Sequence, residues 1–279
     1  MVIIQVLVQL VAVVFVMVAI ASLVCIGPER LRRTRTELRP RFVVAAPYLV
    51  LLVAVLALNS ATRRSMQQIS WLIAWNLTGW IYSVERNFVS VLQSWLYSPE
   101  ATVYFSFIYL FGYAFLLVFP LVAYFALETQ EPLQEVTAAY AANYGIGLIC
   151  YLFVVAFGPR NIGVADQLMY DLYPQAQLIT TAVNVNTNVF PSLHTSLSAT
   201  VMLFAWRTRE AYPLWLPIAT VIGLSVIVST MYLGIHWAID VLAGLVLAVV
   251  SVKLGVEIVG RRIGGFPVGR KVSRWYADR

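Results

Sequence analysis

The sequence predicts an all-α protein, a polytopic transmembrane bundle of six to seven helices, from its composition and the length of its apolar runs. Of its 279 residues, 61% are hydrophobic and only 11% are charged, whereas soluble domains are roughly half apolar and a quarter charged. Several runs are long enough to cross a hydrocarbon core of about 30 Å, which takes about 20 helical residues. We therefore expect a single membrane domain over residues 1–279 and exclude a soluble globular protein.

Seven apolar runs give the upper helix count if each of them crosses the membrane. The first run, Val2–Ile26, lacks a basic flank and is too long for the core of a signal peptide, so we expect a retained helix. The run Leu193–Trp206 is short, but Ser and Thr on one face suit a helix buried among others. The other expected spans are Phe42–Leu58, Ala101–Leu127, Val136–Phe157, Leu214–Leu233 and Trp237–Val259.

Residues 61–100, between the second and third spans, mix aromatic side chains with scattered polar ones. Because Trp and Tyr concentrate at the headgroup level of membranes, we expect one or two amphipathic helices lying on the surface. A re-entrant segment would give the same pattern. The aromatic residues concerned are Trp71, Trp75, Trp80, Tyr82, Trp95 and Tyr97.

Arginine and lysine predict the orientation of the bundle, because cytoplasmic segments carry an excess of both. With seven spans, three basic segments fall on one side: residues 30–41, the turn 206–213, and the tail from Arg261 to Arg279. We expect that side to be cytoplasmic and the N-terminus to lie outside. The net charge of +6 then reflects orientation in the membrane and not a nucleic-acid partner. The opposite side holds Arg63, Arg64, Arg86 and Arg160.

Four ionisable residues, Arg160, His194, His236 and Asp240, are expected at the outer ends of spans. Such groups are costly in a membrane and are functional candidates by default. His236 and Asp240 are four residues apart, which on a helix puts both side chains on one face. A carboxylate bound to one imidazole nitrogen leaves the other free to act as nucleophile or base. We therefore predict an activated histidine at the non-cytoplasmic face.

The second histidine, His194, follows the run Phe190–Leu193, which is typical of a helix start. Ser192 suits the capping position, and the backbone amides of a first helical turn can cradle an anion. Arg160, which comes after Gly158 and Pro159, adds a planar fork matched to phosphate oxygens. A nucleophile, an acid/base and an anion cradle are the parts that phosphoryl transfer through a phosphohistidine needs.

Each of these residues also has a structural interpretation. Either histidine suits a packing or headgroup contact, Arg160 suits a snorkelling anchor, and Asp240 suits a hydrogen bond to Ser or Thr inside the membrane. Their coincidence at one face favours the catalytic interpretation. A transporter would carry ionisable residues or broken helices in paired positions near the bilayer midplane, and no such pattern is evident in the sequence. A non-enzymatic scaffold that retains both histidines stays an alternative.

At these residues the chain resembles the type 2 phosphatidic acid phosphatase superfamily, which includes the vanadium haloperoxidases. Pro191–His194 matches the family's second block, Pro-Ser-x-His, and Ser229–Asp240 matches the spacing of the third, Ser-Arg-x5-His-x3-Asp. Thr230 stands where phosphatases carry an Arg, and of the first block, which ends in Arg-Pro in the family, the chain keeps only Pro159–Arg160. In this it looks closest to the branch of the inositol phosphorylceramide synthases, which move a phosphoryl headgroup between lipids.

The resemblance implies a reaction that needs no metal and no organic cofactor, within a catalytic core at about residues 136–260. We expect a membrane phosphoesterase that cleaves a lipid or polyprenyl phosphate through a phosphohistidine at the outer face, with water or an alcohol as acceptor. A headgroup phosphotransferase is the alternative. The implied roles are nucleophile for His236, orientation of that ring for Asp240, acid/base for His194, and phosphate binding for Arg160, Ser192 and Ser229.

Overall fold

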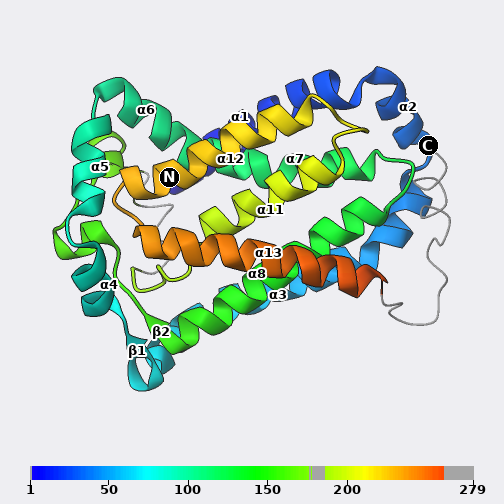
Figure 1. The fold of residues 1–279 in the computed structure, drawn as a ribbon. Helices are drawn as coiled ribbons and strands as arrows, with labels where there is room; N and C mark the ends of the chain where they lie inside the picture. The colour runs from blue at the N-terminus through cyan, green and yellow to red at the C-terminus, as the bar shows by residue number, and fades with distance from the viewer. Residues whose placement is uncertain (1, 176, 178–185, 261–279) are drawn as a thin grey trace.

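The computed structural model describes residues 2–175, 177 and 186–260; the basic tail from Arg261 and the side chains of Arg63 and Arg64 lie outside that description. The described chain is an all-α helical bundle, which confirms the predicted fold class (Figure 1). Helices of this length and composition make it a multi-pass membrane protein. Within the described residues, six helices are long and apolar enough to cross a membrane: Ile4–Ile26, Leu38–Thr62, Pro99–Phe125, Glu131–Phe153, Trp215–Tyr232 and Ala238–Gly260.

The short predicted run Leu193–Trp206 is a helix of 15 residues, α11 (Leu193–Arg207), which is shorter than these six and packs on α7, α8, α12 and α13 (Figure 1). Its polar face is turned inwards, since Asn143 in α8 donates to Ser196 Oγ at 2.7 Å and to Thr200 Oγ1 at 3.3 Å. The other elements of the bundle are α1 (Val2–Ala21) with the π-helical η1 (Ser22–Ile26), α2 (Pro28–Thr36), α3 (Leu38–Ile73), α6 (Pro99–Phe107), the π-helical η2 (Ile108–Gly112), α7 (Tyr113–Phe125), α8 (Glu131–Phe153), α12 (Trp215–Tyr232) and α13 (Ala238–Gly260).

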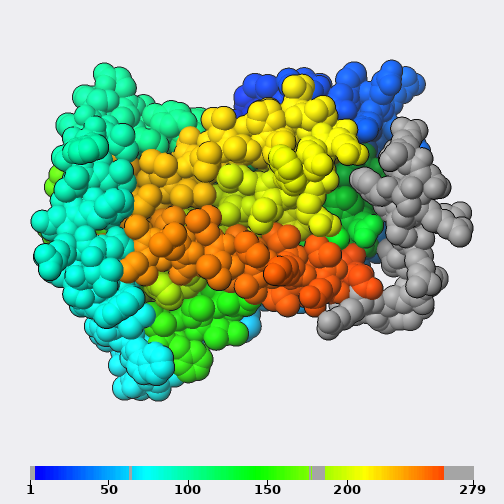
Figure 2. All heavy atoms as spheres, viewed as in Figure 1, coloured from blue at the N-terminus to red at the C-terminus, as the bar shows by residue number. Residues whose placement is uncertain are grey.

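The expected surface segment 61–100 begins later than predicted. Helix α3 continues unbroken for 36 residues, because residues 61–73 contain neither Gly nor Pro. Two short helices then follow, α4 (Thr78–Glu85) and α5 (Phe88–Leu96), which lie across one end of the bundle (Figure 1). In the space-filling view, the cyan atoms of this stretch form a layer over that end (Figure 2). Its exposed Trp side chains are those of Trp71, Trp75, Trp80 and Trp95.

A two-residue ladder that the sequence did not indicate closes the same end. Strand β1 (Trp75–Asn76) pairs in parallel with β2 (Val154–Val155). The chain therefore leaves the helical conformation after Phe153, whereas we had expected the span to reach Phe157. Two further short elements, η3 (Pro159–Ile162) and α9 (Leu168–Leu172), follow at this end.

Two glycines allow the segments near this end to approach one another closely. A β-carbon at Gly244 in α13 would lie 2.5 Å from the carbonyl oxygen of Ser192, and one at Gly158 would lie 2.2 Å from that of Ile235. Both distances are shorter than real carbon–oxygen contacts, so a side chain at either position would push the two backbones apart. The start of α11 can therefore touch α13, and the loop before Arg160 can touch the turn before His236.

The described basic segments meet at the opposite end of the bundle (Figure 1). Arg30 Nη1 donates to the carbonyl oxygen of Ala211 at 3.1 Å, which joins α2 to the turn after α11. Arg41 donates to the carbonyl oxygens of Phe125 and Leu127. A guanidinium there satisfies carbonyls that the end of α7 leaves without helical partners. These two basic segments therefore share one end, as the orientation argument requires.

Replacement of Gly244 by Ala should destabilise the protein, because the new methyl group would lie 2.5 Å from the carbonyl oxygen of Ser192 and 3.1 Å from Cβ of Thr195, neither of which is the far end of a flexible side chain. We expect a loss of roughly 1–3 kcal/mol, the usual range for overpacking, seen as a lower melting temperature in detergent. Gly145→Ala in α8 is the matched control, because nothing lies within 4 Å of its added β-carbon. Equal melting temperatures for the two variants would contradict the close contact between α11 and α13.

Candidate active site

His236 lies in the turn between α12 and α13, one residue before the capping position of α13. We had expected His236 and Asp240 to share one face of a regular helix. They do not, because His236 precedes the helix, yet the two side chains still lie close together. His236 Nδ1 and Asp240 Oδ2 are 3.6 Å apart, which is close but longer than a hydrogen bond. Asp240 Oδ2 instead accepts from the backbone amide of Trp237 at 2.8 Å. This is the bond that the third residue of a helix makes to the N-cap amide in a capping box.

Burial keeps the His236 ring neutral. Burial lowers the pKa of the imidazole below its ordinary value of 6.5, and the positive charge of Arg160 lowers that pKa further. A hydrogen bond with the Val189 backbone acts in the opposite direction and raises it. Only 2% of the residue is exposed. A neutral imidazole carries the free lone pair that a nucleophile or base needs.

His194, the second residue of α11, is held between two tyrosines. Its ring centroid lies 4.5 Å from that of Tyr109 and 4.3 Å from that of Tyr113. Tyr109 belongs to the π-helical segment η2, and such segments often occur at functional sites. The centroids of His194 and His236 are 6.3 Å apart, so the structure brings the two predicted histidines together.

Arg160, in η3, reaches the same neighbourhood. Its backbone amide donates to the carbonyl oxygen of Gly234 at 2.9 Å, in the turn that leads to His236. Its Nη2 donates to the hydroxyl of Tyr170 at 2.9 Å, and the guanidinium lies 4.6 Å from that ring's centroid. Nη1 is buried and has no hydrogen-bond partner among the described residues. That N–H group is free to bind an anion.

The two serines are engaged elsewhere. Ser192 Oγ caps α11 by accepting from the amide of Thr195 at 3.3 Å, as its position predicted. Ser229 Oγ donates to the carbonyl oxygen of Val226 at 2.7 Å, one turn back in α12. Both side chains are fully buried, and neither residue lines the cavity that holds the histidines. A phosphate contact by either hydroxyl therefore requires a change of rotamer.

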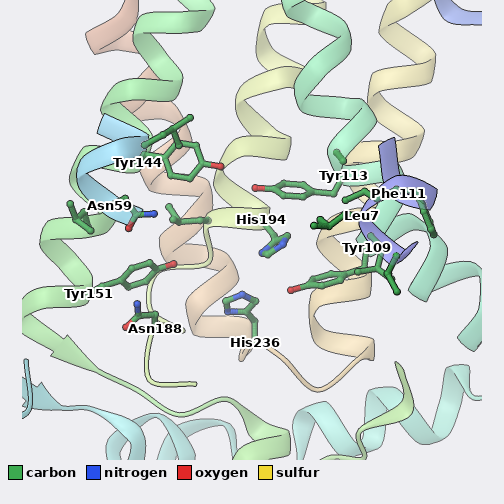
Figure 3. A pocket seen from close by; sticks show the side chains of 17 residues that line it. Leu7, Asn59, Tyr109, Phe111, Tyr113, Tyr144, Tyr151, Asn188, His194 and His236 are labelled. Carbon is green, nitrogen blue, oxygen red and sulfur yellow. The ribbon is translucent and has the colours of Figure 1, made fainter. Parts of the chain in front are cut away.

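A cavity of about 430 Å³ opens on both histidines (Figure 3). Four tyrosines surround the rings and point their hydroxyls towards them, two from each side in Figure 3. The rest of the lining is mostly apolar and includes Leu10 of α1 and Leu56 of α3, beside the polar Asn59 and Asn188. The cavity thus combines a hydroxyl-rich region at the histidines with an apolar region between helices. Its tyrosines are Tyr109, Tyr113, Tyr144 and Tyr151.

Sequence reasoning missed these tyrosines. Tyr144, Leu148 and Tyr151 recur at the spacing of one helical face, and this was the feature that could have indicated a lined cavity in α8. Tyr109 and Tyr113 are four residues apart, but no sequence pattern revealed that both flank a histidine more than 80 residues away. Their contacts depend on how α7 and α11 pack.

Comparisons with known proteins agree with this architecture. A family model described as the PAP2 superfamily matches residues 79–254, from α4 to α13. An uncharacterized protein of Methanocaldococcus jannaschii is 27% identical over 171 residues, which are 60% of this chain and 66% of that protein. The chain thus spans slightly less than two thirds of that relative's length. No solved structure gave a significant match.

The buried neutral histidine predicts a specific sensitivity to acid. An unfolded histidine takes up a proton as the pH falls through about 6.5, and a folded His236 with a lowered pKa does not. The unfolded state then binds more protons, so folding stability is present above pH 6.5 and falls below it, by up to about 1.4 kcal/mol per pH unit.

Melting temperatures of the wild type and His236→Gln between pH 8 and pH 5 test this expectation. Glutamine does not titrate, so the variant should lose less stability below pH 6.5 than the wild type does. The difference between the two proteins at pH 8, where both side chains are neutral, is the reference. Parallel curves over the whole range would mean that His236 titrates normally in the fold.

Proposed function

The chain belongs to the PAP2 superfamily, and from this premise we propose that it is a membrane phosphoesterase that acts on a lipid or polyprenyl phosphate through a phosphohistidine. The observation that carries the proposal is the cavity shared by His194 and His236, whose ring centroids are 6.3 Å apart. That separation leaves room for a phosphoryl group between an attacking and a leaving group in line. The apolar region of the cavity suits the chain of a lipid.

In the first step, the ring nitrogen of His236 that faces away from Asp240 attacks phosphorus. A P–N bond forms, the ester P–O bond breaks, and its electron pair stays on the leaving alcohol oxygen. A protonated His194 gives that oxygen its proton. Asp240 stabilises the positive charge that develops on the His236 ring, and the present Nδ1–Oδ2 distance of 3.6 Å shortens as it does.

In the second step, a water molecule attacks the phosphohistidine and His194 takes up the water proton. The P–N bond breaks and its electrons return to the His236 ring, which restores the enzyme and releases phosphate. Arg160 Nη1, buried without a partner among the described residues, binds a non-bridging oxygen in both steps. These groups supply nucleophile, acid/base and anion binding from the chain itself.

The distribution of charge supports a reaction at the non-cytoplasmic face. The arginines of α2 and of the turn after α11 lie at the end of the bundle opposite α4 and α5 (Figure 1). An excess of Arg marks the cytoplasmic side. The histidine cavity, near the α4–α5 end, then opens towards the outer leaflet.

One observation favours a headgroup phosphotransferase as the second candidate. Thr230 replaces the Arg of the family's third block, and its hydroxyl donates to the carbonyl oxygen of Ile227 at 2.7 Å. A phosphate-binding cation is thus absent from this position. In the transferase reaction, the hydroxyl of a second lipid replaces water in the second step, as in the inositol phosphorylceramide synthase branch that the sequence resembles.

Product analysis on purified protein in detergent tests the proposal. Phosphatidic acid, a polyprenyl phosphate and phospholipids are offered with and without an alcohol acceptor. His236→Ala should lower turnover by more than about 10³-fold, because the variant lacks the nitrogen that attacks phosphorus in the proposed reaction. His194→Gln should slow both steps but still allow the phosphohistidine to form, which is detected as acid-labile phosphate bound to the protein. This bound phosphate should be missing in His236→Ala.

The product identifies the reaction. Free phosphate that His236→Ala no longer forms would support the phosphatase, and a new headgroup-bearing lipid that it no longer forms would support the transferase. Equal product from the wild type and His236→Ala on every substrate would rule out the phosphohistidine.

A further inference from the structure

The carboxylate of Glu85, the last residue of α4, reaches the start of α13. Its Oε2 accepts from the backbone amide of Ala238 at 2.9 Å and its Oε1 from that of Ile239 at 2.5 Å. These amides belong to the first turn of α13, where helical N–H groups have no partners within the helix. A carboxylate at a helix N-terminus also interacts favourably with the helix dipole.

The two amides that Glu85 binds lie between the two residues of the candidate catalytic pair. Ala238 and Ile239 are the second and third residues after His236, and Asp240 follows directly. Asp240 binds the amide of Trp237, so Glu85 and Asp240 together satisfy three consecutive amides, those of residues 237–239. Loss of Glu85 would leave two of them without acceptors and free the first turn to shift.

A second contact from α4 holds the same segment. The ring of Tyr82 lies edge-on to that of Trp237, with centroids 6.3 Å apart, and the Trp237 indole donates to the carbonyl oxygen of Phe157 at 2.8 Å. Trp237 is fully buried by these contacts. Helix α4 therefore fixes both the backbone and the side chain next to His236.

The neighbouring helix α5 is hydrogen-bonded to the first end of the turn 233–237, which connects α12 to α13. Gln93 is buried; its Nε2 donates to the carbonyl oxygens of Tyr232 at 2.8 Å and Asp166 at 3.1 Å, and its Oε1 accepts from the amide of Asp166 at 2.9 Å. Tyr232 ends α12, and Asp166 follows the loop that carries Arg160. The turn 233–237 is thus held at its first end by α5 and at its second end by α4.

We propose that Glu85 is a positioning residue for the candidate reaction: its carboxylate fixes the first turn of α13 and so sets the orientation of His236 and Asp240. The role rests on the proposed phosphoesterase function, since it acts through that pair. Burial raises the pKa of Glu85, the amides of Ile239 and Ala238 oppose this, and the charge of Asp240 raises the pKa further.

The experiment compares the wild type with Glu85→Ala, Glu85→Gln and the control Glu100→Gln. Glu100 is an exposed carboxylate in the first turn of α6 whose hydrogen bonds are local. Glutamine keeps the size of Glu85 but offers one acceptor, and its NH₂ group faces the second amide, so this variant removes one bond without a cavity. The two readouts are backbone hydrogen exchange and kcat against KM with phosphatidic acid in detergent micelles.

Deuterium uptake at residues 237–240 should rise at least about tenfold in Glu85→Ala, less in Glu85→Gln, and not at all in Glu100→Gln. Uptake in α8 should not change in any variant. With phosphatidic acid, kcat should fall by about 10²-fold in Glu85→Ala while KM stays within about threefold, because a small misplacement of catalytic groups affects the chemical step.

The outcomes separate the two proposals. Unchanged uptake at residues 237–240 in Glu85→Ala overturns the positioning role, and so does faster uptake with an unchanged kcat. Faster uptake with a lower kcat and a constant KM supports it. If the wild type itself cleaves no phosphate ester, the proposed function fails, and deuterium uptake alone then decides whether Glu85 fixes the start of α13. If Glu85→Ala does not fold, the same comparison is made with Glu85→Gln.

Discussion

Backbone hydrogen bonds between three distant segments determine where the candidate catalytic side chains lie. The amide of Arg160 donates to the carbonyl oxygen of Gly234 at 2.9 Å, and that of Ser192 donates to the carbonyl oxygen of Asp240 at 3.0 Å. Within the third segment the amide of His236 donates to the carbonyl oxygen of Thr230, also at 3.0 Å. In a membrane protein such groups must find partners inside the protein, so these bonds are costly to break. The side chains themselves are less tightly joined, as the 3.6 Å separation of His236 and Asp240 illustrates.

Three polar side-chain atoms of the candidate site are left without partners in the described part of the chain, whereas the backbone segments around them are hydrogen-bonded to one another. His236 Nδ1, Asp240 Oδ1 and Arg160 Nη1 are all buried and have no hydrogen-bond partner among the described residues. An unpaired polar atom in a buried site is unfavourable unless something binds it. A phosphate ester offers oxygens that Arg160 Nη1 can bind, whereas His236 Nδ1 faces the carboxylate of Asp240. In the proposed function, the backbone network holds this polar site in place for the phosphate ester.

The spans were predictable because apolar runs of membrane length need no knowledge of tertiary contacts. The proximity of His236 to Asp240 was also predictable, since four residues cannot carry the two side chains far apart. The orientation of the two side chains was not predictable, because the Asp240 carboxylate accepts from the backbone amide of Trp237 and the helix begins only after His236. The ladder between β1 and β2 and the bond from Glu85 to α13 join residues 79 and 153 positions apart. No periodic pattern marks such pairs, and only the packed bundle reveals them.

In the proposed reaction, charge balance links the choice of substrate to the protonation of His194. A phosphate monoester carries close to two negative charges near pH 7, whereas a phosphodiester carries one. At the described site Arg160 is the permanent cation, and Thr230 stands where the family pattern has another. A desolvated dianion needs a second positive charge, which a protonated His194 supplies, and the proposed leaving-group step requires the same proton. A diester is balanced by Arg160 alone. In the proposed mechanism, hydrolysis of a monoester therefore depends on a proton at His194 from the moment of binding, while headgroup transfer from a diester needs it only at the chemical step.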